Sequence, residues 1–114
     1  METINWGEVD RVIRVEAADA LAAAGHSERA LQLRALRPVT DELAALELTR
    51  VATRHIDELR GPIYGRAQRL MVSVLCAAIA AWRGYPVPLR RHLIAVERRA
   101  ARMTAHPALQ EASA

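Results

Sequence analysis

Apolar residues recur every three or four positions along most of this chain, which is the spacing that places them on one face of an α-helix. The first such segment opens with Asn5 and Glu8 at capping-box spacing, and Gly25 follows its end as a stop. Pro38, the Gly-Pro pair at 61–62 and the segment 84–88 interrupt the pattern again. The pattern therefore predicts helices at about residues 5–24, 27–36, 39–60, 63–83 and 88–103.

The helix predicted over 63–83 is the most apolar segment of the chain. It has no charged residue from position 70 to position 82, and a helix that is apolar nearly all round must be covered on most sides. Its large side chains form a wide arc, and a narrow arc of small residues around Ser73 continues toward Arg66 and Arg69. The helix predicted over 88–103 has a narrower apolar seam, suited to packing against one other helix.

These features predict an all-α fold, a compact helical bundle of four main helices plus one short helix, with helix 63–83 at its centre. Residues 1–104 would form a single helical domain, and residues 105–114 a flexible C-terminal tail. The other helices are too few to cover both arcs of helix 63–83, which favours a homodimer. The candidates for the core or the dimer interface are Leu70, Val74, Leu75, Ile79, Trp82, Leu89 and Leu93.

Charge is divided unevenly along the chain. All sixteen basic residues are arginine, and residues 1–60 hold eight of them against eleven acids, whereas residues 61–114 hold eight against two. A guanidinium binds carboxylate or phosphate through two parallel hydrogen bonds, so an arginine-rich helix is a candidate contact for an acidic protein or a nucleic acid. A solvated outer face of the bundle would explain the same residues. The candidates on helix 88–103 are Arg90, Arg91, Arg98, Arg99 and Arg102.

Residues 20–36 combine a helix, a glycine turn and a second helix, a pattern similar to a degenerate helix-turn-helix. In that interpretation Glu28, Arg29 and Gln32 would contact bases and phosphates. His26 and Arg34 stand where such motifs place apolar residues, and this half of the chain is net acidic. An ordinary corner between two helices is therefore favoured.

Residue types that carry catalysis are scattered along the chain. No two histidines are spaced for one helix face, and no cysteine or carboxylate joins them at a metal-ligand interval. The glycines do not cluster into a phosphate loop. His55 lies within an apolar face of helix 39–60 and Cys76 within an apolar run, so both are expected to be core residues. We expect no catalytic residues, no metal, no cofactor and no small-molecule substrate, and therefore no enzyme.

Two functional hypotheses follow. The first is a non-catalytic regulator that binds a protein partner as a homodimer; small inhibitors, adaptors and antiactivators of transcription factors or defence complexes are analogues in size and class alone. The alternative is a nucleic-acid-binding accessory protein that uses helix 88–103 or residues 20–36. The longest uncharged run outside the tail is thirteen residues, against about 20 for a membrane span, and the N-terminus has no signal-like segment. A cytoplasmic protein without membrane contact is expected.

Overall fold

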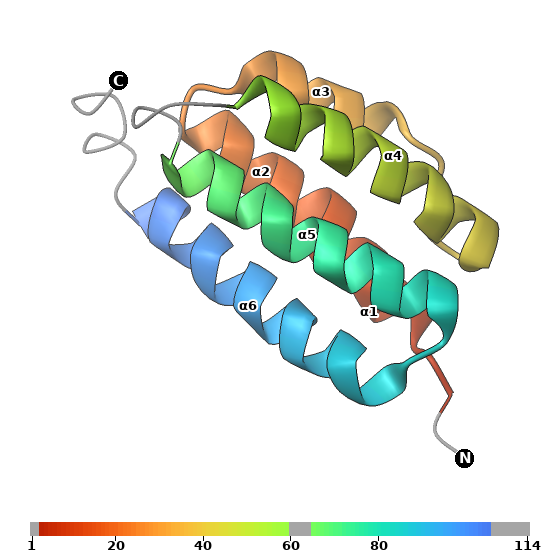
Figure 1. Cartoon of the computed structure of the whole chain (residues 1–114). Helices are drawn as coiled ribbons and strands as arrows, with labels where there is room; N and C mark the ends of the chain where they lie inside the picture. Colours follow the sequence, from red (N-terminus) through yellow and green to blue (C-terminus); the bar gives the residue numbers. More distant parts are fainter. Residues whose placement is uncertain (1–2, 60–64, 106–114) are drawn as a thin grey trace.

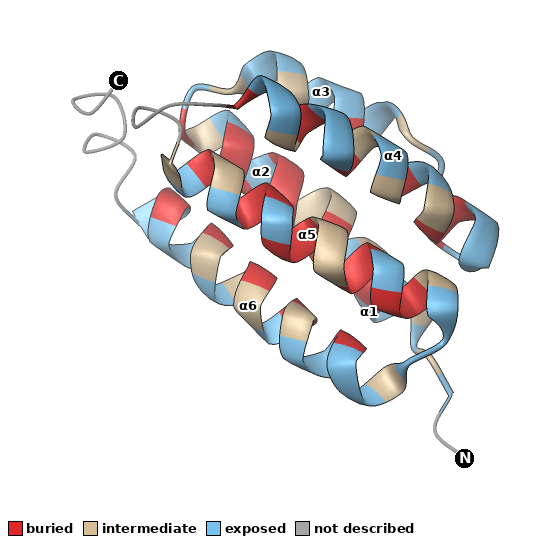
Figure 2. Cartoon of the chain, in the orientation of Figure 1, coloured by how far each residue is buried: buried red, intermediate tan, exposed pale blue. Residues whose placement is uncertain are grey.

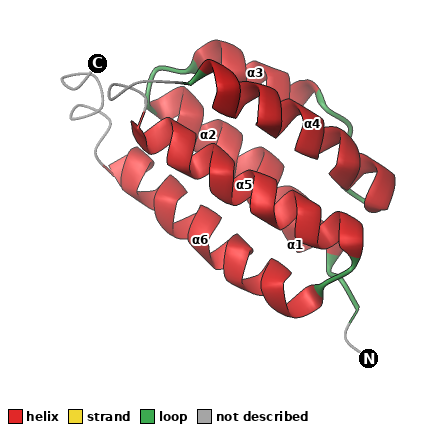
Figure 3. Cartoon of the chain, viewed as in Figure 1, coloured by secondary structure: helices red, strands yellow, loops and turns green. Residues whose placement is uncertain are grey.

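The computed structural model describes residues 3–59 and 65–105, and these residues are helical over most of their length (Figures 1 and 3). The elements are α1 (Trp6–Asp10), the π-helical segment η1 (Arg11–Glu16), α2 (Ala17–Ala23), α3 (Ser27–Ala35), α4 (Glu42–Glu58), α5 (Gly65–Arg83) and α6 (Pro86–Ala105). No strand occurs in the described ranges. The all-α bundle predicted from the sequence is therefore confirmed. The expected tail at 105–114 lies outside the described residues, apart from Ala105 at the end of α6.

Both ends of the first helix follow the predicted local signals. The Asn5 Oδ1 atom accepts a hydrogen bond from the Glu8 backbone amide at 3.1 Å, which satisfies an amide of the first turn. At the other end Gly25 adopts a φ of 91°, and the His26 amide donates to the Leu21 carbonyl at 2.8 Å. A helix that ends in this way needs a residue with a left-handed backbone conformation at position 25, and glycine adopts that conformation readily. Because the backbone stays helical at both junctions, α1, η1 and α2 form one continuous helix.

Two predicted boundaries are wrong by a few residues. Helix α4 begins at Glu42 rather than at residue 39, because Asp41 caps it by accepting a hydrogen bond from the Ala44 amide at 2.8 Å. Helix α6 begins at Pro86 rather than at residue 88. Proline is well tolerated in the first turn of a helix, where its missing amide hydrogen is not needed.

Helix α5 is the centre of the bundle, as predicted. It packs against α4 on one side and α6 on the other, with η1 and α2 behind it in the view of Figure 1. Helix α2 in turn packs against α3 and α6. The buried positions of α6 are the five residues of its predicted seam: Leu89, Leu93, Val96, Ala100 and Met103.

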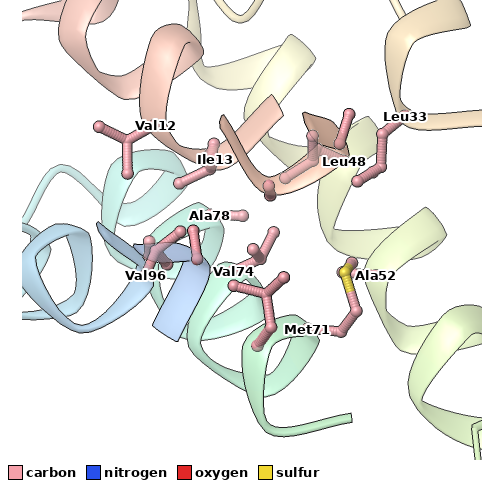
Figure 4. Close-up of a cluster of buried hydrophobic side chains, with 14 of the residues drawn as sticks. Val12, Ile13, Leu33, Leu48, Ala52, Met71, Val74, Ala78 and Val96 are labelled. Atoms are coloured by element: carbon pink, nitrogen blue, oxygen red, sulfur yellow. The ribbon is translucent and has the colours of Figure 1, made fainter. Parts of the chain in front are cut away.

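The core gathers side chains from every described helix, and Figure 4 labels members from η1 and from α3 to α6. Ile13, Leu48 and Met71 are fully buried within it, and burying each such side chain stabilises the fold by about 1.5–3 kcal/mol. Alanines fill many of the remaining positions, which lets the helix backbones approach closely. Figure 2 shows that the buried segments of the helices face this interior.

Asp10 connects the first helix to the segment that precedes α4. Its Oδ1 atom accepts hydrogen bonds from Arg14 Nε at 2.6 Å and from the Val39 amide at 2.8 Å. Its Oδ2 atom accepts a third bond, from Arg14 Nη2 at 2.9 Å. Val39 is buried although it lies outside any helix, so this carboxylate fixes an irregular segment to the core.

Candidate basic surface on helices α5 and α6

Positive charge is concentrated on the two C-terminal helices. Helices α5 and α6 carry eight arginines and a single acid, Glu97. Several arginines of the first half pair with acids of nearby turns or helices. By contrast, Arg69, Arg98 and Arg102 form no ion pair with any carboxylate of residues 3–59 and 65–105. Within the described residues, no carboxylate therefore balances these three charges.

The five arginines predicted on α6 do not share one face. Arg91 and Arg98 are exposed and lie about two turns apart on the side away from the buried seam. Arg90 lines a different cleft, of about 440 Å³, between α6 and the start of the first helix. Arg99 and Arg102 line a cleft on the side of α5. The predicted set is thus divided among three surfaces.

The cleft on the α5 side has a volume of about 400 Å³, and we call it the arginine cleft. It lies where the start of α5 runs beside the end of α6, and the described residues that line it are Arg66, Arg69, Arg99, Arg102 and Met103. Arg99 Nε donates a hydrogen bond to the Ser73 hydroxyl at 3.1 Å, so the small-residue arc of α5 faces α6. The sequence places Arg66 and Arg69 on this arc, but their spacing alone does not show that the arc faces α6.

The seven apolar candidates divide into three groups. Leu70, Val74, Leu89 and Leu93 are buried, whereas Leu75 and Trp82 are half-buried. Ile79 is 38% exposed and Val72, one helical repeat earlier, is 41% exposed. Ile79 therefore lies outside the core. Together with the half-buried Cys76 these residues form an outward apolar row on α5, which we call the α5 stripe: Val72, Leu75, Cys76 and Ile79.

Polar side chains of the helix corner at residues 20–36 contact α4 within the bundle. Arg29 pairs with Glu58 of α4 at 2.5 Å, and Gln32 Oε1 lies 2.7 Å from His55 Nε2. Two of the three residues considered for base and phosphate contact thus hold α3 against α4. Glu28 remains exposed, and its charge repels phosphate. This arrangement fits a structural corner.

His55 is buried completely, as its position on an apolar helix face predicts. With Gln32 Oε1 as acceptor, Nε2 carries the proton and Nδ1 has no partner among the described atoms. A protonated imidazole would have to donate from both nitrogens in this site. Burial is the main cause that lowers the pKa of His55 below its ordinary value of 6.5, and the nearby positive charge of Arg29 lowers it further.

The lowered pKa of His55 predicts a loss of stability at mildly acidic pH. The neutral ring is favoured in the folded state, so its contribution is complete above pH 6.5 and declines as pH falls toward the lower folded pKa. We expect the free energy of unfolding, measured by urea titration at pH 7 and pH 5, to fall less in His55→Leu than in the wild type. An equal fall in both proteins would show that another group causes the acid sensitivity.

The described residues contain no group of three or more His, Cys, Asp or Glu side chains placed to hold a metal ion. None of the helices in this part of the chain combines the length and apolar character needed to cross a membrane. The polar geometry of the described residues therefore centres on the arginines of α5 and α6 rather than on a cluster of titratable ligands.

Comparison with known proteins returns no match, whether to a family model, a curated protein or a solved structure.

Proposed function

We propose that the protein is a non-catalytic regulator, of the inhibitor or adaptor type, that binds a protein partner through the α5 stripe. The observation that carries the proposal is the outward side of α5. Solvent-facing helix surfaces are normally polar, yet every outward position between Arg69 and Arg83 is apolar. An apolar row of this kind on a basic helix pair is typical of a surface that a partner covers.

The charges around the stripe favour an acidic amphipathic helix as the partner segment. Arg69 and Arg83 are fourteen residues apart and so lie about 20 Å apart along the helix axis, one beyond each end of the stripe. Helix α6 runs beside α5 and carries the exposed Arg91 and Arg98. A partner helix would lay its apolar row on the stripe and direct its carboxylates toward these arginines.

A second copy of the chain fits this surface less well than an acidic partner. A two-fold dimer through the stripe would bring the same surface of two molecules together. The arginines around the stripe would then face arginines, and like charges across an interface are unfavourable. We therefore assign the stripe to a different protein, in place of the homodimer expected from the sequence.

The proposal predicts that charge on the stripe abolishes partner binding. In the double variant Val72→Asp with Ile79→Asp, two carboxylates would be buried without partners in the interface, and we expect affinity to fall by about 100-fold or more. The matched control is Leu31→Asp with Leu43→Asp, since these residues on α3 and α4 are 67% and 66% exposed. Binding is measured by calorimetry on a partner captured from native cells after nuclease treatment.

We expect the control to retain binding and the stripe variant to lose it. We also expect the captured partner to contain an acidic helical segment. Equal binding by the stripe variant would place the contact elsewhere. Capture that disappears after nuclease treatment would instead indicate a nucleic acid. A mass of two chains by light scattering, reduced to one by the stripe substitutions, would assign the stripe to a homodimer.

A further inference from the structure

The arginine cleft is a second surface, which adjoins the α5 stripe at Arg69. Of the described residues that line it, four are arginines and the fifth is the buried Met103. No carboxylate is among these described residues. Glu97, the single acid of α5 and α6, lines clefts that α6 shares with the first helix instead. Guanidinium groups that line one cleft repel one another, and an anion bound among them would reduce this repulsion.

One of the guanidinium groups is held in place by a hydrogen bond, and a second lies close to the backbone of α5. Arg99 Nε donates to the Ser73 hydroxyl at 3.1 Å, and Ser73 is itself buried. The Arg69 guanidinium lies against the first turn of α5, with Nη1 3.5 Å from the position that a Cβ atom on Gly65 would occupy. A guanidinium that is already ordered loses less side-chain entropy when it binds an anion.

The charge and the size of the cleft together indicate the ligand. Arg69, Arg99 and Arg102 have no carboxylate partner in the described part of the chain. Three such groups exceed the charge of one phosphate monoester, which is roughly −1.5 to −2 at pH 7. The volume of about 400 Å³ falls within the range of roughly 300–1,000 Å³ typical of ligand pockets.

We propose that the arginine cleft binds a ligand with two or more linked phosphates. Guanidinium groups bind phosphate oxygens through paired hydrogen bonds, and several of them suit a chain of phosphates better than a single one. None of the described residues that line the cleft is aromatic, so these residues offer no stacking surface for a base. The recognised chemistry is therefore the phosphate chain, whether it belongs to a small polyphosphate compound or to a nucleic-acid backbone.

Calorimetry with inorganic pyrophosphate tests the proposal on the full chain, at constant ionic strength. We expect saturable binding of one pyrophosphate per chain, tighter than binding of orthophosphate. The double variant Arg99→Met with Arg102→Met should weaken it by about 100-fold, because two charge-assisted contacts are lost. The matched control Arg50→Met with Arg54→Met removes the same charge from exposed positions on α4 and should bind as the wild type does.

Ser73 is a positioning residue for the Arg99 guanidinium. Replacing it separates the effect of where that guanidinium lies from the effect of its charge. Ser73→Ala keeps every arginine but releases Arg99 Nε, so affinity should fall by a few fold while its dependence on salt concentration stays unchanged. In the double variant Arg99→Met with Arg102→Met, affinity should fall and should also depend less on salt concentration. Folding of each variant is checked by circular dichroism, and Arg99→Lys with Arg102→Lys, which keeps the charge, should restore part of the binding.

A competition experiment identifies the source of the phosphates. If a twelve-nucleotide single strand displaces pyrophosphate from the wild type and also depends on Arg99 and Arg102, the phosphates belong to a nucleic-acid backbone. If only pyrophosphate and tripolyphosphate compete, the ligand is a small compound. Absence of saturable pyrophosphate binding, or equal binding by the double variant, overturns the proposal. Neither result bears on the α5 stripe, because Val72 and Ile79 are unchanged throughout.

Discussion

Replacing Leu70 by alanine is expected to lower the free energy of unfolding by about 3–5 kcal/mol. Leu70 is fully buried in the N-terminal third of α5, a helix that packs against both α4 and α6, and its shortening leaves a cavity in the core. For a domain of about 100 residues with a typical stability of about 5–15 kcal/mol, this is a large fraction of the total. Urea titration followed by circular dichroism measures the change.

The matched control for this prediction is Ile79→Ala on the same helix. Ile79 is 38% exposed, so its truncation creates little cavity and should change the free energy of unfolding by about 1 kcal/mol or less. The pair of variants separates the core side of α5 from its outward side. Equal destabilisation by the two substitutions would mean that Ile79 is covered in solution, by a second copy or by another part of the chain.

Removing the carboxylate of Asp10 is expected to lower the free energy of unfolding by about 2–4 kcal/mol. In Asp10→Ala the guanidinium of Arg14, whose side chain is 13% exposed, loses its charge partner, and the Val39 amide loses its acceptor. The segment before α4 would then detach more readily from the first helix. Chemical denaturation measures the loss, and amide exchange at Val39 should become faster.

Asp19→Ala provides the comparison, because Asp19 also pairs with an arginine, Arg34. Both of these side chains are 51% exposed, and a surface ion pair of this kind contributes about 0–1 kcal/mol. A loss in Asp10→Ala no larger than that in Asp19→Ala would contradict the structural role given to Asp10.

The stabilisation that Asp10 provides depends on pH, because the pKa of its carboxyl group is lowered in the folded state. Burial raises the pKa of Asp10, but the hydrogen bonds from Arg14 and the Val39 amide and the charge of Arg14 together lower it below its ordinary value of 3.8. The contribution is therefore complete above pH 3.8 and is lost as pH falls through the folded pKa. The difference in stability between the wild type and Asp10→Ala should therefore shrink in strong acid.

Much of the fold could be predicted because its signals are local. The cap at Asn5, the left-handed Gly25 and the apolar seam of α6 each depend on residues within a few turns. The start of α4 was predicted three residues too early, because Val39 has the apolar character of a helix position. Its amide is bonded instead to Asp10, twenty-nine residues away, and periodicity holds no information about such a contact.

The π-helical segment η1 is a second feature that the spacing did not predict. Its i to i+5 geometry brings Arg11 within 2.5 Å of Glu16, a pair that an ordinary α-helix would separate. The same wider turn keeps Val12 and Ala17, five positions apart, both facing the core. Apolar spacing alone is compatible with either kind of turn.

The candidate site was predicted in part, and the rest of it depends on how the helices pack against one another. The charge asymmetry and the five arginines of α6 can be read from the chain, but their division among three surfaces depends on how α6 is rotated against α5. The hydrogen bond between Arg99 and Ser73 is one result of that rotation, and it joins residues twenty-six positions apart. The exposure of Ile79 likewise depends on which sides of α5 the other helices cover.

The chain has one cysteine, and Cys76 lies within the α5 stripe, half-buried. The rate of its alkylation by a small thiol reagent, with and without the captured partner, is therefore the most direct test of the proposed interface. The account predicts that the bound partner slows alkylation by about tenfold or more, because it covers the thiol. An unchanged rate on chains that are saturated with partner would contradict it.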